Sequence, residues 1–279
     1  MSQDQGGWRL FFGQWMDLKK CYSSKPPLMD KNSWVALSLG TLVLLMGLFM
    51  GWCLWGNTPP PLYTVPPPSI NVQLPNQHIV TLTMFSPDPK IILLQNFLTT
   101  SECDALIQMG ETHGFARSTV QGSNQNEVSS DRTSHTINFQ RHQNDLISTL
   151  EQRCTLFCPY EAINVENVQI VRYHPGQQYK HHYDFFVPGE EGTALALKRG
   201  GQRHMTFFVY LNDMSTDETG GQTDFPKLNL RVRPEKGMAV MWYNVKNNKE
   251  DFRTFHAGLP PLQSTKYGLN IWIRGQPFI

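Results

Sequence analysis

Two histidines and one aspartate constrain this chain most, because distant segments must meet to bring them together. His182 and Asp184 form an H-x-D triplet, and His256 lies far downstream. On a β-strand, residues i and i+2 point to the same side, so His182 and Asp184 can share one ion while His181 and Tyr183 face away. Two imidazoles and one carboxylate leave coordination positions open on a metal, which suits non-haem Fe(II). The spacing therefore predicts an iron site.

An H-x-D triplet alone is weak, since a surface strand with one hydrogen-bonded histidine gives the same pattern. Lys266 strengthens the metal interpretation, because it follows His256 and opens an alternating apolar and polar run over residues 267–273. Burying a lysine there is costly unless an anion meets it. A dicarboxylate cosubstrate would be that anion.

The motifs as a set resemble the prolyl 4-hydroxylase family of 2-oxoglutarate- and Fe(II)-dependent dioxygenases, of the short plant, algal and viral type. They read Y-H-P-G-Q-Q-Y-K-H-H-Y-D (173–184), G-G-Q-T-D-F-P (220–226) and N-I-W-I-R (270–274), together with His256 and Lys266. The resemblance covers roughly residues 89–279. Related lysyl hydroxylases and oxygen-sensing prolyl hydroxylases use arginine where this chain has Lys266, so collagen-type or cell-wall-type enzymes are favoured.

The resemblance assigns a role to each motif residue. The iron ligands would be His182, Asp184 and His256, and Lys266 would hold the far carboxylate of 2-oxoglutarate as part of the catalytic set. Tyr173 and Thr223 would assist Lys266 in binding the cosubstrate. The peptide groove would be lined by Tyr179, Arg203 and Trp272. The implied cofactors are Fe(II), 2-oxoglutarate, O₂ and ascorbate.

The implied reaction is 4-hydroxylation of peptidyl proline in secretory-pathway proteins, with 2-oxoglutarate converted to succinate. Two alternatives stay open, a catalytically inactive membrane-anchored peptide-binding module and a hydroxylase of another residue type. The charge-rich segment 187–201 and the A-G-L-P-P-L-Q-S-T-K-Y stretch after His256 depart from the family pattern and leave substrate preference open. With a formal net charge of +1 the chain has no basic stripe, so nucleic acid is not an expected partner.

An uncharged apolar segment at residues 34–56 predicts a transmembrane signal-anchor helix. At about 1.5 Å per residue it spans roughly 34 Å, enough to cross a hydrocarbon core of about 30 Å. Tryptophans lie at both ends, where interfaces favour them. Gly47-x-x-x-Gly51 can form a helix-dimer face, which leaves a homodimer open, although glycine is common in such spans.

The flanks of the span predict its orientation. Residues 1–33 carry five lysines and arginines, whereas no charge follows the span before Asp88. The positive-inside rule then places residues 1–33 in the cytosol and the catalytic part in the lumen, as a single-pass type II protein of the endoplasmic reticulum or Golgi. Residues 57–76, whose first part is half proline, predict a polyproline II spacer before a domain at 77–279.

The expected fold is mainly β with flanking helices, a double-stranded β-helix (jelly roll) preceded by one transmembrane helix. Short patterns predict strands near 78–84, 90–95, 116–120 and 134–140, and about eight more after residue 165. Thr99 and Glu102 form a predicted capping box for a helix ending near Gly114, and a second helix is expected at 144–158. The polar segment 122–131 is either a surface loop or a lid.

The five cysteines are too scattered for a disulfide framework. Cys154 and Cys158 are one helical turn apart, where disulfide geometry is poor. Cys103 could pair with one of them, and the sequence does not decide.

Overall fold

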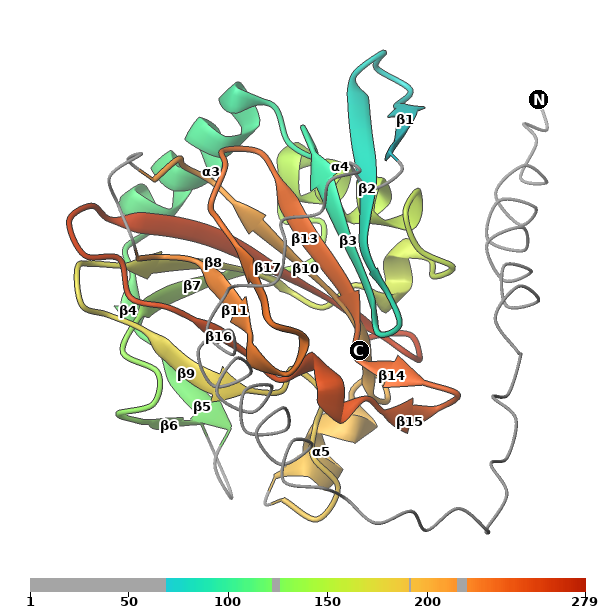
Figure 1. Ribbon diagram of the computed structural model, residues 1–279, viewed down its shortest axis with the longest axis vertical. Coiled ribbons are helices and arrows are strands. Elements are labelled where there is room, and N and C mark those ends of the chain that lie inside the picture. Colours follow the sequence, from blue (N-terminus) through green and yellow to red (C-terminus); the bar gives the residue numbers. More distant parts are fainter. Residues whose placement is uncertain (1–68, 122–125, 191, 215–219) are drawn as a thin grey trace, which may run out of the picture. The chain divides into compact units, whose positions relative to one another are not determined.

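The structure, a computed structural model, describes residues 69–121, 126–190, 192–214 and 220–279, and within them two antiparallel sheets dominate (Figure 1). The larger has nine strands, in the order β1 (Ser69–Gln73), β2 (Ile79–Pro87), β3 (Lys90–Gln95), β13 (Ala239–Tyr243), β10 (Arg203–Tyr210), β17 (Lys266–Arg274), β8 (Val168–Tyr173), β7 (His135–Phe139) and β4 (Ala116–Arg117). The smaller has four strands, β12 (Leu230–Val232), β11 (Thr223–Phe225), β16 (His256–Gly258) and β9 (Tyr179–His182).

Short hairpins and helices complete the described part of the chain. The hairpins are β5 (Thr119–Gln121) with β6 (Asn126–Val128), and β14 (Val245–Lys246) with β15 (Lys249–Glu250). The α-helices are α3 (Thr100–His113), α4 (Asp145–Thr155) and α5 (Thr193–Lys198), and the 3₁₀ turns are η2 (Ala162–Asn164), η3 (Pro226–Leu228) and η4 (Phe252–Thr254).

Strand alternation divides the interior into two hydrophobic cores on opposite faces of the large sheet. Along β10, Met205, Phe207 and Val209 pack in the core that also contains buried residues of α3 and α4. Phe208 and Tyr210 point the other way, into a core shared with the smaller sheet. The helices therefore cover one face of the large sheet, and the space between the two sheets is left for a site.

Several local predictions are confirmed. Thr99 caps α3 with a complete capping box, and Gly114 follows its last residue. Asn144 caps α4, which ends at Thr155, three residues short of the predicted end at 158. Among the described residues after 165, eight strands build the two-sheet jelly roll, and the extra β14–β15 hairpin lies outside it.

Other expectations need correction or fall outside the described residues. Strand β1 lies within the expected spacer and pairs with β2, so the sheet begins at Ser69 rather than 77. The predicted transmembrane segment at 34–56 and the glycine pair within it are not among the described residues. No described helix is long and apolar enough to cross a membrane. Helix α5, within segment 187–201, was not expected from the sequence.

The cysteine question is resolved for the described thiols. Cys103, Cys154 and Cys158 are all free and buried. Burial raises the pKa of Cys103 to about 12 and that of Cys158 to about 11. These thiols are therefore core residues that stay protonated at neutral pH.

Candidate active site

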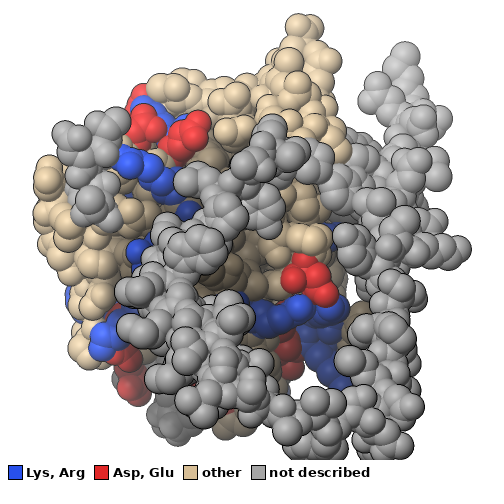
Figure 2. Space-filling view, viewed as in Figure 1, with Lys and Arg blue, Asp and Glu red and all other residues tan. Residues whose placement is uncertain are grey.

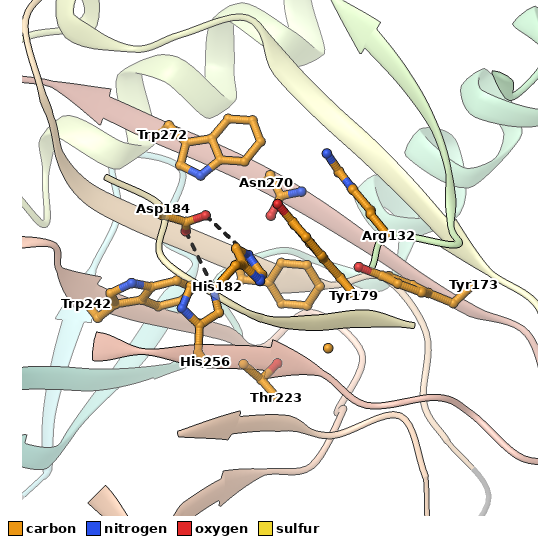
Figure 3. A pocket seen from close by; sticks show the side chains of 12 residues that line it. Arg132, Tyr173, Tyr179, His182, Asp184, Thr223, Trp242, His256, Asn270 and Trp272 are labelled. Atoms are coloured by element: carbon orange, nitrogen blue, oxygen red, sulfur yellow. Dashed lines mark ion pairs between the residues drawn. The ribbon is translucent and has the colours of Figure 1, made fainter. Parts of the chain in front are cut away.

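The three predicted metal ligands meet between the two sheets (Figure 3). His182 is the last residue of β9, His256 is the first of β16, and the two face each other in the antiparallel register. Asp184 lies just beyond the end of β9, and its Oδ1 and Oδ2 are each 3.7 Å from one Nε2, that of His182 and that of His256 respectively. Within the described residues, this is the one group of three or more His, Cys, Asp or Glu side chains that could hold a metal ion.

Backbone carbonyls fix both imidazoles in the orientation that a metal needs. His182 Nδ1 lies 2.8 Å from the Lys180 carbonyl, and His256 Nδ1 lies 2.9 Å from the Thr254 carbonyl. A ring nitrogen next to a carbonyl must donate to it, so each Nδ1 carries the proton and each Nε2 is left as a free lone pair. The two Nε2 atoms point to the same place as the Asp184 carboxylate, so these residues fit a divalent metal.

Burial and charge set the protonation states that metal binding requires. Burial lowers the pKa of His256 to about 4, helped by the neighbouring His182, so its imidazole is neutral at pH 7. Burial alone would raise the pKa of Asp184, but His256 and His182 hold it well below its ordinary value. A neutral imidazole and an ionised carboxylate are the forms that bind metal.

The residues next to the ligands, His181 on β9 and Tyr183 just beyond it, contact other side chains, as the alternation predicted. His181 points away from the three ligands, and its Nε2 lies 2.9 Å from Asp224 Oδ2. Tyr183 stacks on Phe185, with ring centroids 4.7 Å apart, and accepts a hydrogen bond from Lys227. Neither residue is available to the metal position.

Lys266 is buried between the sheets without a carboxylate partner among the described residues. It is 1% exposed, and its Nζ lies 5.1 to 5.4 Å from the ring centroids of Phe208, Tyr173 and Tyr210. Gly268 permits this packing, because a Cβ there would overlap the Phe208 ring. Burial lowers the pKa of Lys266 to about 7. An ammonium in such a place is stabilised by an anion that enters the site.

The other two predicted cosubstrate residues lie beside Lys266. Tyr173 is its partner across β8 and β17, and burial raises the pKa of this phenol to about 12, so it remains a hydrogen-bond donor. Thr223 is buried in β11 and accepts a hydrogen bond of 2.7 Å from the Tyr210 hydroxyl. Because that bond occupies a lone pair of Thr223 Oγ1, the threonine proton is free to be donated into the pocket.

Two of the three predicted groove residues line the pocket between the sheets, and the third does not. Tyr179 stacks on His182 with ring centroids 3.5 Å apart, and Trp272 stands on the opposite wall (Figure 3). Arg203 is absent from the pocket lining. Its guanidinium lies 3.8 Å from the Trp272 ring centroid and forms an ion pair with Glu166 at 2.7 Å. Arg203 therefore supports the wall of the pocket.

The sequence did not point to several residues that shape this pocket. Arg132 and Asn270 line it, and so do Phe208 and Trp242, which also belong to the hydrophobic core between the sheets. Arg132 lies 4.8 Å from the Tyr179 ring centroid and donates to the Thr119 carbonyl. The alternation along β17 would have indicated Asn270, because it shares a face with Lys266 and Trp272. Arg132 had no such signal.

Lys266 itself is not part of the pocket lining, although Tyr173 and Phe208 beside it are. Arg274, the other buried cation on the same face of β17, forms an ion pair with Glu166 at 2.8 Å. Of these two cations, Lys266 is the one without a carboxylate partner among the described residues, which favours it over Arg274 as an anion receptor.

Comparison with known proteins agrees with this geometry. Residues 168–274 match the 2OG-Fe(II) oxygenase superfamily. Prolyl 4-hydroxylase 1 of Arabidopsis thaliana is 31% identical over 203 residues, covering 67% of this chain and 69% of that protein. Prolyl 4-hydroxylase 5 of the same plant is 29% identical over 220 residues, covering 70% and 72%. The viral collagen prolyl hydroxylase of Paramecium bursaria Chlorella virus-1, solved with 2OG, gives a TM-score of 0.53 at 29% identity, covering 66% of this chain and 95% of the other.

Proposed function

Because this chain belongs to the prolyl 4-hydroxylase family of 2OG-Fe(II) oxygenases, we propose that it hydroxylates peptidyl proline at C4 while 2-oxoglutarate is converted to succinate and CO₂. One observation carries the proposal most directly. The half-buried His182 and the buried Asp184 and His256 lie between the same two sheets as Lys266, a buried lysine without a carboxylate partner among the described residues. A metal and a dicarboxylate are the ligands that these two features need.

The iron would be held by Nε2 of His182, a carboxylate oxygen of Asp184 and Nε2 of His256. When bound with 2-oxoglutarate, Fe(II) supplies the O₂-dependent oxidation that couples loss of CO₂ to insertion of one oxygen atom into a C–H bond. The chain keeps Nδ1 of both histidines bonded to backbone carbonyls, so the ligands remain oriented through turnover. Ascorbate is part of the proposal as the reductant.

Three side chains would bind the far carboxylate of 2-oxoglutarate. Lys266 contributes the positive charge, which requires its protonated form, and the anion approaches it past the rings of Tyr173 and Phe208. The Tyr173 hydroxyl and the Thr223 hydroxyl each donate one hydrogen bond, the latter oriented by Tyr210. Charge-assisted contacts of this kind are strong where water is excluded.

The peptide would enter between Tyr179 and Trp272. The two rings flank the three metal ligands in the pocket, so a proline ring placed between them lies next to the iron position (Figure 3). Arg203 holds Trp272 in place through its stacking contact and its ion pair with Glu166. The side chains exclude water and fix the target carbon, which is the protein's contribution to such a reaction.

A nucleic-acid substrate is not supported. Where the described residues are visible in Figure 2, the basic side chains stand beside acidic ones instead of forming a stripe. Phosphate backbones are bound by clustered lysines and arginines. A proline-rich peptide partner agrees better with the aromatic walls of the pocket.

The test is turnover by the full chain with Fe(II), 2-oxoglutarate, ascorbate and O₂, presented with poly-proline, collagen-like and arabinogalactan-like peptides. We expect equal amounts of succinate and 4-hydroxyproline with at least one peptide, and neither product with His182→Ala, Asp184→Ala or His256→Ala at unchanged folding. Peptide binding without any product would support an inactive binding module. Hydroxylation of another amino acid would overturn the proline assignment while keeping the oxygenase.

The proposed location is the membrane of the endoplasmic reticulum or Golgi, with a single-pass anchor at 34–56 and a lumenal catalytic domain. Its support is the lysine-rich flank of residues 1–33 against the uncharged flank after the span. A protease added to sealed microsomes should trim only the first thirty or so residues, roughly the predicted tail. Digestion of the catalytic domain without detergent would contradict this orientation.

A further inference from the structure

The Asp184 carboxylate rests on a short chain of buried polar side chains outside the metal ligand set. The Thr206 hydroxyl donates to Asp184 Oδ2 at 2.7 Å, and the Asn244 amide Nδ2 donates to Thr206 Oγ1 at 2.9 Å. Thr206 and Asn244 are both 0% exposed. A polar pair placed in a hydrophobic interior is costly unless each bond is formed, so this pair calls for an explanation.

The chemistry of the three side chains fixes the direction in which the hydrogen bonds are donated. A carboxylate that binds a metal is ionised and only accepts hydrogen bonds, so the Thr206 hydroxyl must donate its single proton to Asp184. Thr206 can then only accept from Asn244, which requires the amide nitrogen to face it. With the amide reversed, its oxygen would compete with Asp184 for the one threonine proton. The Asn244–Thr206–Asp184 order therefore gives the Thr206 hydroxyl both a donor and an acceptor, whereas Asn244 Oδ1 is buried without a hydrogen-bond partner among the described residues.

The surrounding sheet shields the Asn244–Thr206–Asp184 hydrogen bonds from water and holds their side chains in place. Thr206 lies on β10 directly opposite Trp242 on β13 and Trp272 on β17, so an indole flanks it on each side. Trp242 is 1% exposed and Trp272 is 8% exposed, which keeps water from the threonine. The Asn244 backbone is held at both ends, because its N–H donates to the His204 carbonyl and its own carbonyl accepts from Asp251. A hydrogen bond in such a dry place is strong.

We propose that Thr206 and Asn244 are positioning residues that fix the Asp184 carboxylate for single-oxygen metal ligation. Thr206 engages Oδ2, which leaves Oδ1, on the His182 side, as the oxygen that binds the ion. Asn244 keeps the threonine proton pointed at Asp184. The inference rests on the proposed metal site and adds residues that neither touch the metal nor belong to any motif of the sequence.

The experiment measures the affinity of the full chain for Co(II) from the visible absorption of the bound ion. Thr206→Val keeps the side-chain shape and removes the hydroxyl, and it should weaken Co(II) binding about 10- to 100-fold, the usual effect of losing a partner of a metal ligand. Thr206→Ser restores the hydroxyl and should bind within about 3-fold of the natural protein. Asn244→Ala should lose about 3- to 10-fold, because the threonine hydroxyl remains but is free to rotate.

The matched control is Thr193→Val, which removes another buried threonine hydroxyl, one that donates to the Val187 carbonyl. It should leave Co(II) affinity unchanged even if stability falls. The proposal is overturned if Thr206→Val and Thr193→Val bind Co(II) equally well, or if Thr206→Ser binds as weakly as Thr206→Val. Failure of the natural protein itself to bind Co(II) would instead refute the metal site.

Discussion

Strand β17 has a buried cation at each end, and the two differ in whether a carboxylate of the described residues pairs with them. Lys266 and Arg274 are its first and last residues, lie on the same face, and are 1% and 2% exposed. Arg274 forms an ion pair with Glu166 at 2.8 Å, and Arg203 shares that carboxylate. Lys266 has three aromatic rings around its Nζ and no carboxylate among the described residues.

This difference indicates that Arg274 stabilises the fold, whereas Lys266 is available to bind an anionic ligand. Arginine cannot lose its proton in a protein, so Arg274 stays charged when buried, and Glu166 supplies the compensating anion. Lysine can lose its proton, and burial lowers the pKa of Lys266 to about 7, so the folded protein tolerates it without a carboxylate partner among the described residues. Burial alone would raise the pKa of Glu166, but Arg203 and Arg274 hold it below its ordinary value. Glu166 therefore remains the permanent partner.

Removing that partner should have the largest effect on stability. Glu166→Gln leaves two buried guanidinium groups without their shared carboxylate, and breaking such a buried pair costs about 3–5 kcal/mol. Urea unfolding measures the change. The control is Asp88→Asn, which removes an exposed carboxylate bound to Lys246 and Arg253 and should cost at most about 1 kcal/mol. Equal losses in the two variants would mean that Glu166 does not hold a structural pair.

Removing the charge of Lys266 should instead weaken cosubstrate binding. Lys266→Ala deletes a contact worth on the order of 2–5 kcal/mol, so the 2-oxoglutarate KM should rise at least about 30-fold with Fe(II) affinity nearly unchanged. Lys266→Arg should recover part of the loss, because the charge stays but the planar guanidinium needs more room. If the KM stays constant and peptide binding weakens, Lys266 belongs to the groove.

The lowered pKa of Lys266 also predicts how stability changes with pH. The folded pKa is about 7, below the value of about 10.4 in an unfolded chain, so the unfolded state binds more protons between these pH values. The burial cost is then fully present below pH 7 and declines by about 1.4 kcal/mol per pH unit as pH rises through this window. Lys266→Met should therefore be more stable than the natural protein at pH 7, with an advantage that shrinks toward pH 9. A constant difference would show that the buried lysine stays charged.

The neutral partners of the cosubstrate should give the smallest changes. Tyr173→Phe and Thr223→Val each remove one hydrogen bond of about 1 kcal/mol, which predicts a rise of about 5-fold in the 2-oxoglutarate KM. Tyr210→Phe should act in the same direction through Thr223, whose hydroxyl it orients. A change in Fe(II) affinity rather than in KM would place these residues on the metal side of the pocket.

The sequence predicts the features of this site that depend on local periodicity. The i and i+2 rule separated His182 from His181, and the capping box fixed the start of α3, because each is a matter of a few neighbouring residues. Asp184 already shows the limit of the rule, since β9 ends at His182 and the aspartate reaches the metal position from beyond the strand.

The hydrogen-bond and ion-pair partners of the site residues could not be predicted from local periodicity. Thr206 meets Asn244 because β10 pairs with β13 in one particular register, and it meets Asp184, which follows β9, because the smaller sheet faces the larger one. Both contacts join segments far apart in the chain. Glu166 accepts from both Arg203 and Arg274 for the same reason. A one-residue slip would turn each strand's other face to the site, and no local pattern specifies which register forms.

The central claim is that Lys266, which has no carboxylate partner among the described residues, binds a dicarboxylate from solution. Proton uptake on binding tests this claim most directly. Calorimetric titration of 2-oxoglutarate into the Co(II)-loaded protein at about pH 8, in two buffers of different ionisation enthalpy, counts the protons taken up. The natural protein and Arg274→Met should each take up close to one proton, because Lys266 must become charged, and Lys266→Arg should take up none. Binding by the natural protein without proton uptake, or equal uptake by Lys266→Arg, would contradict the account.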